Sequence, residues 1–156
     1  MQAAEEQNLE IVKLFVNVCG VDIINSRNSR NGCTALHYSS WESDDTEFMK
    51  FLLQSGAKVD ALDTDGETAL FYSIDFAHPE QVKVLLAARA AVNLRITDGD
   101  TPLDKALKDH FYGENKVAAR AKIVELLEAA GGLRAVDLPD NDDDDALLTN
   151  EIESCN

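Results

Sequence analysis

A five-residue motif, Gly-x-Thr-Ala/Pro-Leu, occurs three times in this chain of 156 residues. Its threonines are Thr34, Thr68 and Thr101, which gives a repeat period of about 33 residues. A leucine pair keeps the same period, at Leu52-Leu53 and at Leu85-Leu86. Two motifs in phase at this period are typical of a stacked repeat protein, in which each unit buries its apolar face only against its neighbours. Such stacks usually offer an extended surface to a partner and rarely enclose a reactive pocket.

The segments 60–70 and 93–103, which carry two copies of the motif, resemble the ankyrin repeat almost position by position. The resemblance implies a hairpin finger, a short inner helix that begins near the motif threonine, and a longer outer helix that ends at the leucine pair. Asp, Asn and Gly suit the finger, because Asp and Asn bond their own backbone in turns and Gly accepts a positive φ angle. We therefore expect an all-α solenoid of ankyrin type with short β-hairpin fingers.

The resemblance covers about residues 1–132 and divides them into four units. We expect a partial capping unit at about 1–25 and full units at about 26–60, 60–93 and 93–132, followed by an acidic, flexible tail at 133–156. The tail carries eight acidic residues against the single base Arg134, a net charge of −7 out of −15 for the chain. Such a block of like charges normally stays solvated. The segment 146–152 is expected to form a turn or two of helix only on docking, because it is too short to persist alone.

The fourth unit is longer than the second and third. With Leu126 taken as the first leucine of its pair, the interval from the motif threonine to that leucine is about eight residues longer than in the earlier units. The extra residues fall around 110–115, and insertions in repeat proteins usually lie in loops near the binding face. We expect residues 117–122 to extend the outer helix as a cap over the last apolar edge.

In the ankyrin plan, side chains that follow the motif leucine point into a concave face and the fingers project beside it. Trp41, the only tryptophan, stands where the repeat usually has a small or polar residue. It is either a binding anchor, since exposed Trp and Tyr are enriched at hot spots, or a side chain that fills a gap over the neighbouring helix. The resemblance implies a partner-binding surface formed by Tyr38, Trp41, Glu42, Tyr72, Asp75, Phe76, Lys105, Lys108 and Asp109 on the inner helices, by Arg27, Arg30, Asp63 and Arg95 on the fingers, and by Phe111 and Tyr112 in the insertion.

The resemblance also implies a structural histidine. His37 occupies the fourth place of Thr-Ala-Leu-His, where the family uses histidine to join the turn to the helix by hydrogen bonds. Phe71 and Asp104 occupy the equivalent places in the later units. We therefore expect this hydrogen-bond network to be incomplete in the third and fourth units.

No residue pattern supports catalysis, a cofactor or a metal. Three cysteines without a Cys-x-x-Cys pair indicate reduced thiols in an intracellular protein. Asp140, Asp142, Asp144 and Glu151 have the spacing of an EF-hand calcium loop, but Asp145 stands where the sharp turn requires Gly. We take the spacing as a coincidence of an acidic run, and we expect a protein that is not an enzyme.

Charge narrows the class of partner. Lys and Arg do not cluster, which argues against nucleic acid, and no apolar run is long enough for a membrane span. We expect a monomer in the cytoplasm, or alternatively the nucleus, that binds another protein with an electrostatic preference for a basic one. Two alternatives stay open: an acidic escort that shields a basic protein with its tail, and a regulatory or structural fragment of a larger protein.

Overall fold

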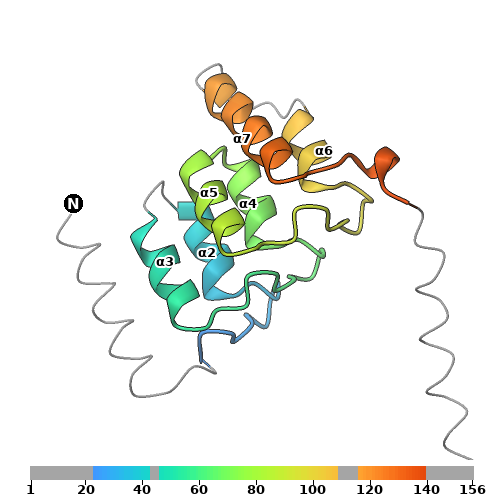
Figure 1. Ribbon diagram of the computed structural model, residues 1–156. Coiled ribbons are helices and arrows are strands. Elements are labelled where there is room, and N and C mark those ends of the chain that lie inside the picture. The colour runs from blue at the N-terminus through green and yellow to red at the C-terminus, as the bar shows by residue number, and fades with distance from the viewer. Residues whose placement is uncertain (1–22, 43–45, 109–115, 140–156) are drawn as a thin grey trace, which may run out of the picture.

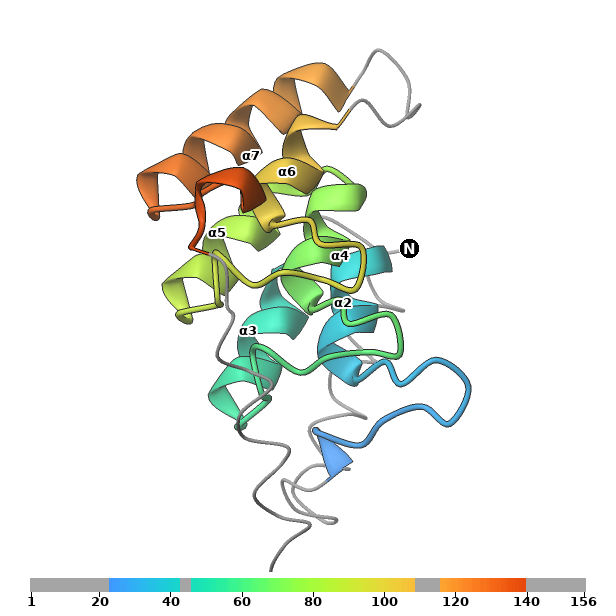
Figure 2. The ribbon, with the colours of Figure 1, turned by 90° about the vertical axis from the view of Figure 1, so that its right-hand side faces the viewer.

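The computed structural model describes residues 23–42, 46–108 and 116–139, in which the helices form two layers (Figures 1 and 2). Each unit gives one helix to each layer, so that the inner helices lie side by side and the outer helices lie behind them. None of the described helices is both long enough and apolar enough to cross a lipid bilayer. The inner layer holds α2 (Ala35–Glu42), α4 (Ala69–Asp75) and α6 (Pro102–Leu107), and the outer layer holds α3 (Glu47–Gln54), α5 (Pro79–Ala87) and α7 (Val117–Ala129).

One continuous apolar core runs between the layers. The motif leucines Leu36, Leu70 and Leu103 are 1%, 1% and 6% exposed. Each comes two positions after the motif threonine that precedes its inner helix. Apolar side chains of the outer helices, such as Met49 and Val82, are fully buried against them. A unit of two short helices could not persist alone in water, so this shared core is what holds each helix in place.

The outer helices end in the same way, and this fixes their register. The N–H of the residue five positions after Leu52, Leu85 and Leu127 donates to the leucine carbonyl at 3.0, 3.0 and 2.8 Å. The residue before each donor has a positive φ angle, as a Schellman motif requires. Leu127, which is fully buried, is therefore the equivalent of Leu52 and Leu85. The register taken from Leu126 is wrong by one residue.

The β-hairpins expected in the fingers are not confirmed, since no strand occurs within 23–42, 46–108 and 116–139. The fingers of the third and fourth units are tight turns. Each is closed across its base by one backbone bond, Asp63 N–H to Glu67 C=O at 3.0 Å and Ile96 N–H to Asp100 C=O at 3.0 Å, with a second bond inside the turn from the N–H of Gly66 or Gly99. A strand ladder needs several such bonds in succession. Gly66, with φ of 79°, makes one of these turns possible.

Successive units are joined by one recurring hydrogen bond between a side chain before one finger and a backbone N–H before the next. Asn25 accepts from Lys58 N–H at 2.8 Å, and Asp60 accepts from Ala91 N–H at 2.8 Å. Asn93 accepts from Leu133 N–H at 2.7 Å in the same manner. Residues 133–138, which we call the strap, therefore begin where a further finger would begin. The strap contains the 3-10 helix η3 (Ala135–Asp137).

Candidate partner-binding face

Four aromatic rings form a row across the inner layer. The rings of Tyr38 and Trp41, both on α2, are nearly parallel with centroids 6.5 Å apart, and Trp41 lies 5.8 Å from Phe76 at the end of α4. His78 follows at 6.2 Å from Phe76. Trp41 is 49% exposed, while the other three rings are half-buried. The row thus joins the second and third units and leaves about half of Trp41 exposed to solvent.

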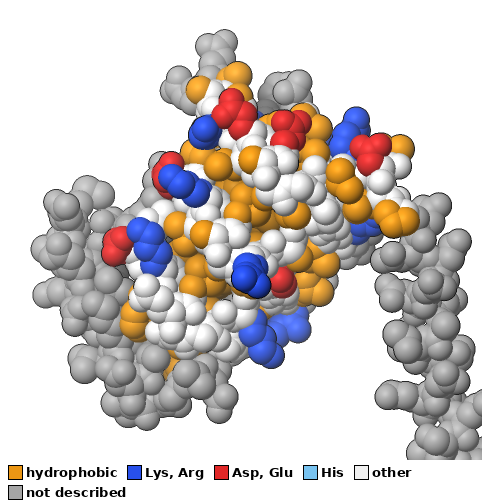
Figure 3. Space-filling model, viewed as in Figure 1, with side chains coloured by type: hydrophobic (Ala, Val, Ile, Leu, Met, Phe, Trp, Pro, Cys, Tyr) orange, Lys and Arg blue, Asp and Glu red, His pale blue; other side chains and the backbone are white. Residues whose placement is uncertain are grey.

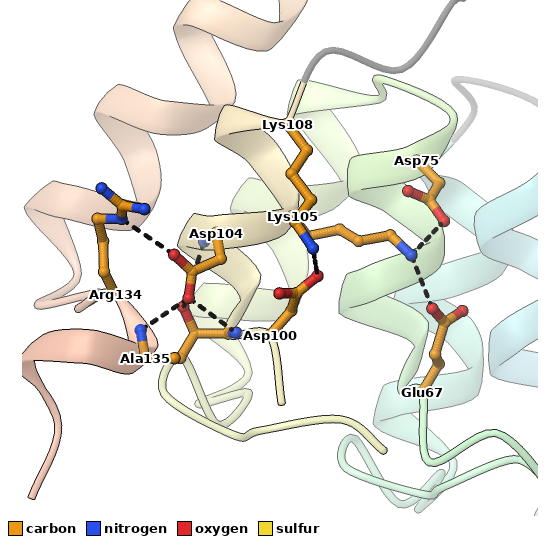
Figure 4. A network of polar contacts seen from close by, with 9 residues as sticks. Glu67, Asp75, Asp100, Asp104, Lys105, Lys108, Arg134 and Ala135 are labelled. Carbon is orange, nitrogen blue, oxygen red and sulfur yellow. Dashed lines mark hydrogen bonds and ion pairs between the residues drawn. The ribbon is translucent and has the colours of Figure 1, made fainter. Parts of the chain in front are cut away.

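An ion-pair cluster begins at Asp75, the residue before Phe76. Lys105 of α6 places its Nζ 2.8 Å from Glu67 Oε1 and 3.2 Å from Asp75 Oδ2 (Figure 4). The Lys105, Glu67 and Asp75 side chains are 14%, 19% and 26% exposed. Burial disfavours the charged ammonium group, but the two carboxylates raise the pKa of Lys105 above its ordinary value. The cluster carries one net negative charge and ties the fourth unit to the third.

Two residues of the predicted surface, Tyr72 and Asp63, make contacts inside the stack. The Tyr72 hydroxyl donates to Asp63 Oδ2 at 2.8 Å and lies 3.1 Å from the Sγ of Cys33. Asp63 is only 5% exposed, and its other oxygen accepts from the N–H groups of Asp65 and Glu67 at 2.9 Å. Burial, together with the hydrogen bonds of Tyr72 with Cys33 and Asp63, raises the pKa of the Tyr72 hydroxyl. Asp63 is therefore placed to hold the finger together and offers little area to a partner.

The histidine of the second unit joins turn and helix. His37 Nδ1 lies 3.1 Å from Thr34 N and 2.9 Å from Thr34 Oγ1, while Nε2 lies 3.1 Å from the Glu67 carbonyl oxygen of the next unit. The side chain is 1% exposed, and burial lowers its pKa despite the Glu67 carbonyl. In the third unit this network is incomplete as expected, since Thr68 makes no side-chain cap and Phe71 is fully buried.

In the fourth unit the expectation of an incomplete network is wrong, because Asp104 replaces the histidine with a different set of bonds. Its carboxylate accepts from Thr101 Oγ1 at 2.9 Å, from Ala135 N–H at 2.7 Å and from Arg134 Nε at 3.0 Å (Figure 4). Burial opposes ionisation, but the Ala135 N–H, the Arg134 guanidinium and Thr101 together bring the pKa of Asp104 down to about 2. Asp104 thereby fastens the strap to the first turn of α6. The repeat motif does not predict this role of Asp104. The available signal was its position three residues after Thr101, which is the spacing of a capping box.

The predicted basic residues differ in what they contact. Arg95 donates to the carbonyls of Ala135 and Leu138 at 2.7 and 3.2 Å, so it holds the strap. Lys108 pairs with Asp100 (Figure 4). Arg27 donates through Nε to the Gly32 carbonyl at 3.2 Å within its own finger. Arg27 and Arg30 are both exposed on the first finger.

Some predicted features lie outside the described residues. These are Asp109, Phe111, Tyr112, the side chain of Glu42 and the calcium-loop pattern at 140–151. Within 23–42, 46–108 and 116–139, no group of three or more His, Cys, Asp or Glu side chains is arranged to hold a metal ion.

Comparison with known proteins gives one consistent result. The family model for ankyrin repeats in three copies matches residues 1–98 and 43–130. A BTB/POZ domain and ankyrin repeat-containing protein of rice, NH5.2, is 27% identical over 98% of this chain, and a second one, NPR5, is 32% identical over 78% of it. An ankyrin repeat protein of Rickettsia felis is 33% identical over 62% of the chain. The chain spans 35%, 23% and 46% of the lengths of these relatives.

Proposed function

The chain belongs to the ankyrin-repeat family, whose members are generally non-enzymatic protein-interaction modules, and we propose that it binds a partner protein through the inner-helix side of its stack. The aromatic row of Tyr38, Trp41, Phe76 and His78 is the anchor of this surface. The single observation that carries the proposal is the 49% exposure of Trp41 in a row of otherwise half-buried rings.

The size of the tryptophan supports an anchoring role. A Trp side chain has roughly 250 Å² of surface, so about half of that area is open to a partner. At about 25 cal/mol per Å², burying it would contribute about 3 kcal/mol, or roughly a hundredfold in affinity. The ring is already held by stacking on two neighbours, so little side-chain entropy would be lost on binding.

Charge supports a preference for basic partners. The net charge of −15 favours encounter with a positively charged protein, mainly by raising the association rate. On the face shown in Figure 3, several Lys and Arg side chains lie beside Asp or Glu. With 14 Lys and Arg against 29 Asp and Glu, the chain does not supply the excess of cations that phosphate binding uses, and we propose a protein partner in place of nucleic acid. The buried, free thiol of Cys33 suits a reducing compartment such as the cytoplasm or nucleus, where we place the protein as a monomer.

The test is capture of partners from a cell lysate followed by affinity measurement on the captured protein. Trp41→Ala should weaken binding by roughly 10- to 100-fold, measured under conditions in which a urea titration shows that the variant is folded. Val117→Ala is the matched control, because Val117 is an apolar residue, 69% exposed, on the outer layer. Equal affinity for wild type, Trp41→Ala and Val117→Ala would refute the proposed face. The proposed preference for basic partners is refuted separately if the affinity does not fall as the salt concentration rises from about 50 to ~300 mM.

A further inference from the structure

The described part of the stack ends at α6 and α7 with an exposed apolar side chain. Leu107 lies six residues after its motif threonine and is 51% exposed. The residues at the same place in the second and third units, Ser40 and Ile74, are 0% and 1% exposed. Ser40 lies in α2, which packs against α4, and Ile74 lies in α4, which packs against α6. Among the described residues, α6 has no such neighbour on its far side.

The described chain after α7 runs beside the first turn of α6. The strap is tied to the fourth unit by the same bond that joins earlier units, through Leu133 N–H and Asn93. Asn93 also donates to the Gly131 carbonyl at 3.1 Å, as Asn25 does to the Gly56 carbonyl at 3.0 Å two units earlier. Residues 131–138 are therefore placed as the start of a fifth unit, and Asp104 and Arg95 fix the strap there.

The sequence that follows contains a variant of the inner-helix start. Thr34-Ala-Leu and Thr68-Ala-Leu have a counterpart in Asp145-Ala-Leu, with aspartate as a strong N-cap in place of threonine. In the third and fourth units the motif threonine comes 12 positions after the residue with positive φ that ends the preceding outer helix, from Gly56 to Thr68 and from Arg89 to Thr101. Asp145 comes 14 positions after Gly131. A finger two residues longer accounts for the difference. Leu147 then takes the place of the three motif leucines, all of which are buried.

We propose that residues 146–152 dock on the α6–α7 end of the stack as a fifth inner helix and cover Leu107. Ala146 lies eight positions after Leu138, and an extended chain of that length spans up to about 27 Å, more than the length of a short helix such as α6. Packing against the stack would stabilise a helix too short to form by itself.

Charge complementarity supports this occupant. Residues 99–139 hold six Lys and Arg against seven Asp and Glu, a net charge of −1, whereas residues 1–98 carry a net charge of −7 and residues 140–156 hold seven acidic residues and no base. One cation of this end has bonding capacity to spare: Arg120 donates through Nη1 to the Lys108 carbonyl at 2.7 Å, but its Nη2 is buried with no hydrogen-bond partner among the described residues. The acidic run 142–145 would therefore approach the least acidic part of the body.

The experiment is a double-mutant cycle in the full chain, read by thermal unfolding and by amide hydrogen exchange of α6 and α7. Leu107→Ser and Leu147→Ser should each lower Tm by about 3 °C or more and speed exchange at least tenfold in both helices, and the two effects should not add. Leu62→Ser is the control for Leu107, being an apolar residue 44% exposed on a finger. Thr149→Ser is the control within the docked segment. Both controls should shift Tm by less than about 1 °C.

Two results would overturn the proposal. If Leu147→Ser leaves Tm and the exchange of α6 and α7 unchanged, the segment does not cover this edge. If light scattering shows a dimer that Leu107→Ser converts to a monomer while Leu147→Ser does not, a second copy covers the edge instead.

Discussion

The replacement Asp104→Asn should weaken the attachment of the strap and remove part of the acid sensitivity of the fold. The pKa of Asp104 is about 2 in the folded protein against an ordinary value of 3.8. At about 1.36 kcal/mol per pKa unit, this difference corresponds to about 2.5 kcal/mol of stabilisation by the ionised carboxylate. The side chain is only 10% exposed, so solvent screening reduces this value little. Asparagine keeps one acceptor oxygen, and we expect a loss of about 2 kcal/mol at neutral pH.

The dependence on pH identifies the carboxylate as the cause. Because the folded pKa lies below the unfolded one, the contribution is present above about pH 4 and is lost as the pH falls towards 2. The difference between wild type and Asp104→Asn should therefore shrink to about half by pH 3. Urea titrations at pH 7, 5, 4 and 3 measure it, with Asp137→Asn, an exposed position on the strap, as the control. A difference of the same size at pH 7 and pH 3 would refute the reasoning.

Three further predictions concern the stack. Gly66→Ala and Gly99→Ala both place a Cβ at a positive φ of about 80°, but only the Cβ at position 66 meets a neighbour, Thr97 Oγ1 at 3.0 Å. We expect Gly66→Ala to lower the free energy of unfolding in urea by about 2 kcal/mol and Gly99→Ala by about 1 kcal/mol. Equal losses would contradict this. Lys105→Met should destabilise the protein by at least about 1 kcal/mol, because it leaves two shielded carboxylates unpaired; a loss that vanishes in high salt would show the pair to be a surface one. The pKa of His37 is lowered in the folded state, so wild type should lose stability below about pH 6.5 more steeply than His37→Asn, and parallel pH profiles would argue against it.

The phased motifs predicted the helical pairs because burial of the motif leucine repeats at a fixed place in every unit. Leu36, Leu70 and Leu103 lie in the first turn of their helices as predicted and are buried. The register of the last outer helix was missed because Leu126 and Leu127 are adjacent and equally apolar. The positive φ of Gly131, a backbone property, decides between them.

The polar contacts were harder to predict, because they depend on which chain segment lies opposite a side chain. Asp104 was read as a missing histidine, yet the strap supplies the donors that complete its bonds. Asp63 sits on a finger, where the resemblance implied exposure, but the hydroxyl of Tyr72 and two backbone N–H groups draw it inward. Trp41 was predicted with two roles, anchor and gap filler, and its stacking and its exposure are compatible with both.

The most direct test of the recognition face uses the single tryptophan. Protein labelled with 5-fluorotryptophan carries one fluorine signal, which arises from Trp41 whatever the tryptophan content of an unlabelled partner. On saturation with a captured partner, we predict that this signal shifts or broadens and becomes insensitive to solvent exchange between H₂O and D₂O. A signal that keeps its position, its width and its solvent isotope shift in the saturated complex would place the binding surface elsewhere.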